Sequence, residues 1–302
     1  MKEFTRIRYE APAPHVARIV LDRVDTRNAQ DAQLLYELND AFDIAAQDDA
    51  VKVIILAANG PHFSSGHDLR DAGQVDTVER FKTVGTWSGF RAEGAEGRVA
   101  FEKEAFFGFS ERWRNIPKPT IAQVQGKAIA GALLLIWPCD LIVASDDAQF
   151  QDNTVAMGVN GVEFFAHPYE FGARKAKEML FRASWVSAAE AHRLGMVNHV
   201  VPRDDLASFT LDLAVDIARK PMFALRLAKE SVNAAQDAQG RLSAMATAFA
   251  QHQLGHAHNR LRFQTIIDPS FFDQAPQAMP GLKQAIVSFG GGEGRNNPSS
   301  AD

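Results

Sequence analysis

Two short glycine-containing segments hold the residue types that can bind an oxyanion through the main chain. They are residues 63–69 (Phe-Ser-Ser-Gly-His-Asp-Leu) and 126–131 (Gly-Lys-Ala-Ile-Ala-Gly). Glycine lets a ligand oxygen approach the backbone closely, and preorganised N–H groups stabilise developing negative charge in a dry pocket. The apolar residues 132–137 that follow predict a buried helix, whose N-terminus favours an anion. The chemistry predicted is stabilisation of an enolate or a tetrahedral intermediate.

Proton transfer requires titratable side chains near such a site, and Glu163 is the first candidate. It stands between Val162 and two phenylalanines, an apolar setting that we expect to raise the carboxyl pKa and suit it to acid/base work. His167 follows four residues later, so the two side chains would meet on one helical face unless Pro168 breaks that turn. The alternatives are a helix-dipole partner for Glu163 and a capping or surface histidine for His167.

Two further sets of residues are weaker candidates. Asp152 either turns towards the pocket or, next to Asn153, forms a turn. His252, His256 and His258 have helix-compatible spacing for a metal ion, the first two being one turn apart. Because no acidic residue or cysteine lies near these histidines in the sequence, we expect no metal site there.

The elements that must position these residues alternate between strands and helices. Apolar runs predict strands, and leucines and aromatics at helical spacing predict helices. The expected order is a strand at 16–21, a helix at 32–46, strands at 51–57 and 120–124, a buried helix at 131–138 and a strand at 140–144. This alternation predicts an α/β fold with a parallel sheet, in which both oxyanion segments lie at the carboxyl ends of strands.

The rest of the chain is less regular. Residues 71–115 carry several glycines among many aromatics, and form either a mobile lid or acyl-chain wall, or a helical segment that packs on the sheet. The C-terminal half predicts helices at 188–194, 206–219, 221–235 and 241–253. We therefore divide the chain into a core (1–200), a C-terminal helical region (201–267) and an extended or disordered tail (268–302), rich in glycine, proline and serine.

Composition excludes several classes of protein. The chain has 302 residues, of which 46% are hydrophobic and 23% charged, with a net charge of −5. These values are ordinary for a globular protein and give no reason to expect nucleic acid as a partner. No apolar run approaches the length of a membrane span, and the first residues do not look like a signal peptide. We interpret the single cysteine, Cys139, as a packed thiol. We expect a cytoplasmic protein.

Motifs in order along residues 16–236 resemble the crotonase superfamily, also called the enoyl-CoA hydratase/isomerase family. The similarity rests on the order and spacing of all the motifs together. They are Ile-Val-Leu-Asp at 19–22 with Arg-Asn-Ala at 27–29, the strand at 53–56, residues 63–69, Lys-Pro-Thr-Ile-Ala at 118–122 with Gln-Gly at 125–126, Cys-Asp-Leu-Ile-Val-Ala at 139–144, Ala-Gln-Phe at 148–150, Ala-Ala-Glu-Ala at 188–191 and Gly-Met-Val at 195–197.

This resemblance implies a crotonase-like fold, with a core of ββα repeats in a spiral and C-terminal helices that support a homotrimer or a hexamer. It implies that the N–H groups of His67 and Gly131 bind the thioester oxygen of an acyl-CoA substrate. No cofactor is expected, since coenzyme A belongs to the substrate. The residues implied in substrate binding also include Ser65, Asp68 and Leu69, with Arg27 either near the CoA phosphates or simply solvated.

Hydratases of this family place two glutamates in the active site, and here those positions hold Leu134 and Thr154. Hydration needs a base for the water and an acid for the α carbon, and neither residue titrates near neutral pH. The sequence therefore favours another reaction through a stabilised enolate or oxyanion, such as isomerisation, retro-aldol cleavage or thioester hydrolysis, with Glu163 as the acid/base. The alternative is a non-catalytic acyl-CoA-binding protein. A serine hydrolase is disfavoured, because no nucleophile-elbow pattern surrounds Ser64 or Ser65.

Overall fold

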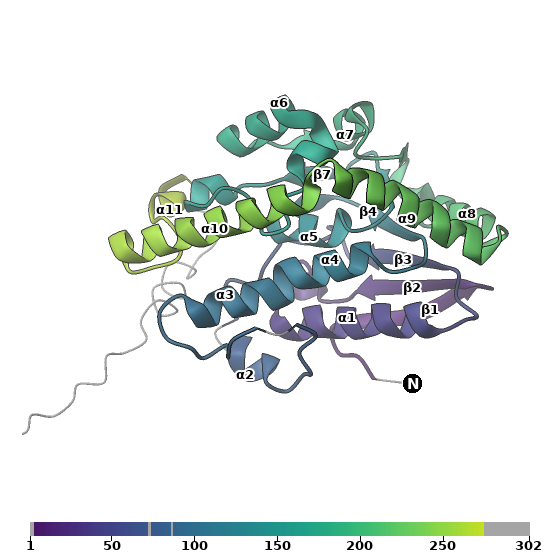
Figure 1. Ribbon diagram of the computed structural model, residues 1–302. Coiled ribbons are helices and arrows are strands. Elements are labelled where there is room, and N and C mark those ends of the chain that lie inside the picture. The colour runs from purple at the N-terminus through teal and green to yellow at the C-terminus, as the bar shows by residue number, and fades with distance from the viewer. Residues whose placement is uncertain (1–2, 72–73, 86, 275–302) are drawn as a thin grey trace, which may run out of the picture.

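A six-stranded sheet forms the centre of the computed structural model, which describes residues 3–71, 74–85 and 87–274 (Figure 1). Its strand order is β1-β2-β3-β4-β6-β9, and every neighbouring pair is parallel except β1 and β2. The strands are β1 (Ile7–Ala13), β2 (Val16–Leu21), β3 (Val53–Ala58), β4 (Thr120–Val124), β6 (Leu141–Ser145) and β9 (His199–Val201). The predicted parallel sheet is confirmed, with β1 as an additional edge strand.

A second sheet of three short strands lies beside the first and was not predicted. It consists of β5 (Lys127–Ile129), β7 (Gln149–Gln151) and β8 (Val186–Ser187), with β7 in the middle. Because β5 ends two residues before Gly131, this sheet fixes the approach to the second oxyanion segment.

Helices cover both faces of the large sheet, as expected for parallel strands buried on both sides. On one face α1 (Ala32–Gln47), α4 (Phe109–Arg114) and α5 (Leu133–Ile136) contribute to the main hydrophobic core. On the other face α8 (Leu206–Ala218) packs through Leu206, Ala214 and Ala218. The sheet is thus a rigid layer whose strand ends can hold a site.

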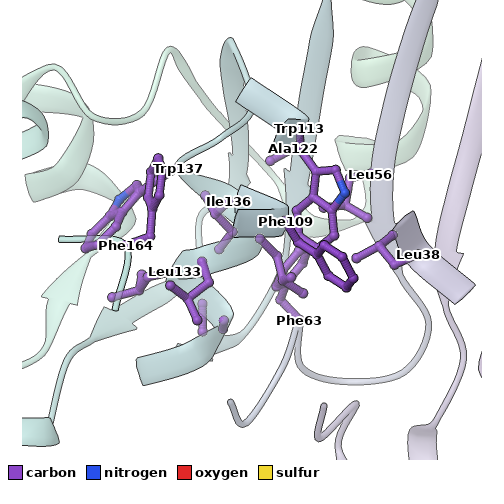
Figure 2. Packing of buried hydrophobic residues seen from close by; sticks show 14 of the residues in the cluster. Leu38, Leu56, Phe63, Phe109, Trp113, Ala122, Leu133, Ile136, Trp137 and Phe164 are labelled. Atoms are coloured by element: carbon purple, nitrogen blue, oxygen red, sulfur yellow. The ribbon is translucent and has the colours of Figure 1, made fainter. Parts of the chain in front are cut away.

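The helix predicted at 131–138 is shorter than expected. A 3-10 turn over Ala130–Ala132 leads into α5, which ends at Ile136 because Pro138 cannot continue a helix. Leu133 and Ile136 of α5 lie in the centre of the core, between Phe63 and Phe109 on one side and Trp137 on the other (Figure 2). The apolar sequence of this helix is therefore explained by burial all round.

The segment over residues 71–115 is mostly helical in its described part. It contains α2 (Gln74–Val78), α3 (Glu96–Glu102), a π-helical turn over Lys103–Gly108 and then α4. Its aromatics Phe101, Phe106, Phe107, Phe109 and Trp113 are buried, as the packed-helix alternative predicted, while Trp87 is exposed. The π-helical turn lies next to the site described below.

The C-terminal part is helical, as predicted. It contains α6 (His167–Arg182), α7 (Ala188–Leu194), α8, α9 (Met222–Ala238) and α10 (Arg241–Phe263), which runs ten residues beyond its expected end. The extended tail predicted from residue 268 is wrong at its beginning, where α11 (Ser270–Gln274) packs on the protein, and residues 275–302 lie outside the described residues. In the described part of the chain no helix has the length and hydropathy of a membrane span.

Candidate active site

The first oxyanion segment follows β3 and is held by hydrogen bonds on both sides of His67. The Gln30 N–H donates to the Gly66 carbonyl over 2.8 Å, and the Asp68 N–H donates to the Gln30 carbonyl over 2.9 Å. The Asn28 side chain donates to the Phe63 carbonyl over 3.1 Å. Gly66 has φ +88°, which a glycine adopts without strain. The His67 backbone is therefore fixed by its neighbours.

The second segment lies directly beside the first. The Ile129 N–H donates to the Ser64 carbonyl over 3.1 Å, which joins the two segments just before Gly131. A methyl group on Gly131 would lie 3.0 Å from the His67 backbone nitrogen and 2.8 Å from His67 Cε1, so a side chain there would crowd the His67 amide. Within the described part of the chain, neither N–H donates to a turn or loop carbonyl. The two segments are therefore close neighbours, and a shared oxygen between their two amides stays a prediction.

The His67 imidazole contacts Glu163. Its Nε2 lies 3.4 Å from Glu163 Oε2, and the ring stacks on Phe106 of the π-helical turn with centroids 3.9 Å apart. Its Nδ1 is buried, with no hydrogen-bond partner among the residues that the structure describes. One face and one nitrogen of the ring are therefore fixed, and the other nitrogen lies unpaired beside Gly131 within the described part of the chain.

Glu163 is 4% exposed and lies between two histidines, since its Oε1 is 3.5 Å from His252 Nε2 of α10. Burial alone would raise the pKa of Glu163, but the positive charge that His252 and His67 can carry outweighs it and lowers the pKa well below its usual value. The predicted upward shift is therefore wrong. The apolar neighbours in sequence do not show the two imidazoles that the fold brings to the carboxylate.

Asp152 and His167 form a second buried pair, with His167 Nε2 2.8 Å from Asp152 Oδ2. Both are 0% exposed, so the surface alternative for His167 is wrong. Asp152 Oδ2 also accepts the Val162 N–H over 3.0 Å, and Oδ1 accepts the Thr154 N–H over 2.9 Å, as the predicted turn requires. Burial opposes ionisation of Asp152, yet these hydrogen bonds and His167 lower its pKa.

The predicted meeting of Glu163 and His167 on one helical face does not occur. Helix α6 begins at His167, with Pro168 in its first turn, so Glu163 precedes the helix. Asp152 instead links the two ends of this loop: it holds His167 directly and fixes Val162, the residue before Glu163. We interpret Asp152 and His167 as residues that position Glu163.

The two positions where hydratases carry glutamates provide no acid or base. Leu134 is 2% exposed in the core, and the Thr154 hydroxyl donates to Asp152 over 2.6 Å. Burial raises the pKa of the Cys139 thiol to about 12, which fits the packed thiol that the sequence predicted. His67 and Glu163, whose side chains are 3.4 Å apart, are the acid/base candidates that the structure brings together at the first oxyanion segment.

The remaining residues implied in substrate binding surround the first segment. Arg27 is exposed, while Asp68 pairs with Arg23 over 3.2 Å and the Ser65 hydroxyl donates to the Thr26 carbonyl over 3.3 Å. Leu69 packs against Ile267 and Phe271 near the C-terminal end of the described chain. The exposed Arg27 side chain is accessible to solvent, whereas Asp68 fixes the loop.

A hollow of about 510 Å³ lies elsewhere, between the start of α6 and α10. It is lined by Phe165, Pro168 and Tyr169 on one side and by residues 243–251 on the other, with no residue of either oxyanion segment. It therefore plays no part in the assignment of the acid/base residues.

Sequence reasoning missed two residues of the site, Phe106 and His252. Phe106 was seen only as one of many aromatics, and His252 only as one of three histidines along a helix. Their contacts with His67 and Glu163 join positions far apart in the chain, and no local spacing signals them.

A parallel α/β core with two backbone amides at adjoining strand ends is an arrangement suited to stabilising negative charge on a carbonyl oxygen. The sequence profile described as enoyl-CoA hydratase/isomerase matches residues 13–264. The chain therefore belongs to the enoyl-CoA hydratase/isomerase family, within the crotonase superfamily, whose members act on acyl-CoA.

Individual relatives agree with this assignment. The chain is 44% identical over 297 residues to EchA13 of Mycobacterium tuberculosis, a protein named as an enoyl-CoA hydratase, covering 94% of this chain and 93% of that protein. A crystal structure named for an enoyl-CoA hydratase from Mycobacterium smegmatis shares 45% identity and a TM-score of 0.78, covering 87% of this chain and 99% of the other. An enoyl-CoA hydratase/isomerase from Xanthobacter autotrophicus Py2 shares 31% identity and a TM-score of 0.77, covering 95% and 98%.

Proposed function

We propose that the protein is an acyl-CoA enzyme in which the His67 imidazole, held by Glu163, moves protons on the acyl chain. The N–H groups of His67 and Gly131 would hold the thioester oxygen while the negative charge of an enolate develops on it. The observation that carries the proposal is the His67–Glu163 contact of 3.4 Å, with His67 Nδ1 unpaired beside Gly131.

The roles of the two residues follow from their electrostatics. A carboxylate with a lowered pKa is a weak base, so Glu163 is better suited to orient a neighbouring imidazole and to stabilise its protonated form. Histidine has an ordinary pKa close to neutral pH and can both accept and return a proton. This revises the sequence-based hypothesis, in which Glu163 itself was the acid/base.

A single proton carrier favours double-bond isomerisation over hydration. In isomerisation, one group removes a proton from the α carbon, the dienolate is held by the two amides, and the same group returns the proton to the γ carbon. Hydration needs a second group that activates water. With Leu134 and Thr154 at the usual glutamate positions, no second group of this kind stands there.

The test is turnover of 3-enoyl-CoA thioesters of several chain lengths, with exchange of the α proton followed in heavy water. For Glu163→Gln and His67→Gln we expect kcat to fall by about 10²–10⁴-fold, the usual contribution of a positioned acid/base, with little change in acyl-CoA affinity. Glu178→Gln, at an exposed position of α6 paired with Arg182, is the matched control and should leave kcat unchanged.

The second candidate function, acyl-CoA binding without catalysis, is favoured by the loss of both usual glutamates. It predicts tight acyl-CoA binding with neither turnover nor proton exchange in the unmodified protein. Turnover that is equal in the parent and both variants would also contradict the proposed roles of His67 and Glu163.

A further inference from the structure

Three buried side chains from two distant segments meet beside the active site. Glu102 ends α3, and His252 and His256 lie one turn apart on α10; their exposed fractions are 4%, 3% and 8%. Their possible ligand atoms all lie within 4.8 Å of one another. The two Nε2 atoms are 2.9 Å apart, and the Glu102 oxygens lie 3.9 Å from His252 Nε2 and 3.7 Å from His256 Nε2.

The other nitrogen of each ring fixes its tautomer. His252 Nδ1 is 2.7 Å from the Gly161 carbonyl, and His256 Nδ1 is 2.9 Å from the Ile266 carbonyl. A carbonyl only accepts, so each Nδ1 carries the hydrogen and each Nε2 of a neutral ring carries a lone pair. Two lone pairs and a carboxylate that face each other at these distances suit either a metal ion between them or a proton on one of the two rings. Histidines that bind metals characteristically donate their other N–H to a carbonyl in this way.

We propose that Glu102, His252 and His256 bind a divalent transition-metal ion, with Zn²⁺ as the ion best suited to two imidazoles and one carboxylate. Ligand bonds of about 2.1 Å in a tetrahedral site place the ligand atoms about 3.4 Å apart. The observed separations of 2.9, 3.7 and 3.9 Å lie on both sides of this value, so small side-chain movements suffice. Three protein ligands leave a fourth position for water.

The residues around the cluster support this role. Gln253 donates a hydrogen bond to Glu102 Oε2, and Arg98 Nε lies 3.8 Å from Glu102 Oε1, so the carboxylate is already oriented. The third histidine of the sequence pattern, His258, is exposed and is not part of the cluster. The expectation of no metal rested on the lack of acidic companions near these histidines in sequence, and Glu102 becomes a companion only through the packing of α3 against α10.

An ion bound at this cluster would connect two separate parts of the protein close to the active site. It would join α3, in the segment that leads to Phe106, to α10 in the C-terminal helical region (Figure 1). His252 is also 3.5 Å from Glu163, whose other oxygen contacts His67. The ion would therefore fix one neighbour of Glu163, although the proposal itself does not depend on which reaction the protein catalyses.

The experiment is titration of the chelator-treated, full-length protein with Zn²⁺ by calorimetry, together with the visible spectrum of the Co²⁺-loaded protein. We expect one ion per chain and the absorption bands of tetrahedral Co²⁺. Glu102→Gln and His256→Gln should weaken Zn²⁺ binding at least tenfold and abolish the Co²⁺ bands. His258→Gln, on the exposed face of the same helix, is the matched control and should bind like the parent.

Glu102→Asp keeps a carboxylate and should retain measurable binding, while the circular dichroism of each metal-free variant shows whether it is folded. No binding by the parent would overturn the proposal, and so would equal loss in His256→Gln and His258→Gln. In either case the 2.9 Å contact would be a hydrogen bond between one protonated and one neutral imidazole. None of these readouts depends on turnover, so a failure here is distinct from a failure of the proposed reaction.

Discussion

The Phe106 ring lies flat against the His67 imidazole, with centroids 3.9 Å apart and planes inclined by 21°. Phe106 belongs to a π-helical turn over Lys103–Gly108, and such turns occur frequently at functional sites. This stacking fixes the plane of the His67 imidazole, the ring that we propose to carry protons. The contact with Glu163 fixes how the imidazole is turned within that plane.

Phe106→Leu should therefore lower kcat more than it changes acyl-CoA affinity. Leucine keeps most of the apolar volume but provides no flat face, so His67 can leave its productive orientation, and such misplacement costs roughly 10- to 100-fold in rate. Steady-state kinetics with separate kcat and KM values provide the measurement. Phe101→Leu, which changes a neighbouring buried ring that contacts Phe106 but not His67, is the control. An equal fall in both variants would indicate a general packing defect.

Gly131→Ala should remove acyl-CoA binding as well as turnover. Its methyl group would lie 3.0 Å from the His67 nitrogen and 2.8 Å from His67 Cε1, distances at which something must move. The loss of one oxyanion donor in other enzymes costs about 10²–10³-fold in kcat. Binding of a CoA thioester by calorimetry and turnover test this prediction. Gly89→Ala, at a site open to solvent, is the control, and an active Gly131→Ala variant would contradict the oxyanion assignment.

Asp152→Asn should destabilise the protein by about 1–3 kcal/mol at neutral pH, since an amide has one accepting oxygen where the buried carboxylate accepts hydrogen bonds through two. The folded state lowers the pKa of Asp152 below the unfolded value of 3.8, so this stabilisation is present above about pH 4 and is lost as the pH falls through the folded pKa. Urea unfolding of parent and variant at several pH values should show a difference that shrinks on acidification. Asp216→Asn, at an exposed ion pair, should change stability by under about 1 kcal/mol at any pH.

The sequence predicted the parts of the fold whose signals are local. The apolar run of β3, buried at all six positions, and the amphipathic α1 with its Asp31 cap stand close to their predicted bounds. The short strands β5, β7 and β8 have two or three residues each, too few for a periodic pattern to show. Their pairing depends on the large sheet that brings them together.

The residues of the site likewise fall into two groups, those that local sequence signals identify and those that only the fold brings together. The two oxyanion segments were found because glycine and the strand ends mark them in the sequence. The partners of Glu163 could not be found, since His67 and His252 lie about ninety residues away in opposite directions and only the fold brings them together. The direction of a pKa shift depends on such partners, which is why the apolar neighbours of Glu163 gave the wrong direction.

The exposed apolar side chains of α9 lead to a last prediction, which concerns assembly. Helix α9 has no buried residue, and Phe223 and Leu227, one turn apart on it, are 69% and 45% exposed. Apolar side chains exposed together in this way mark an interaction surface, and the implied homotrimer or hexamer would cover them. Light scattering after size-exclusion chromatography should give a mass of several chains for the parent and a smaller mass for Phe223→Glu with Leu227→Glu. Gln47→Glu, an exposed polar position at the end of α1, should keep the parent mass. A parent protein that elutes as a monomer would contradict the prediction. In that case no second copy covers Phe223 and Leu227, and the two glutamates would have no interface to disrupt.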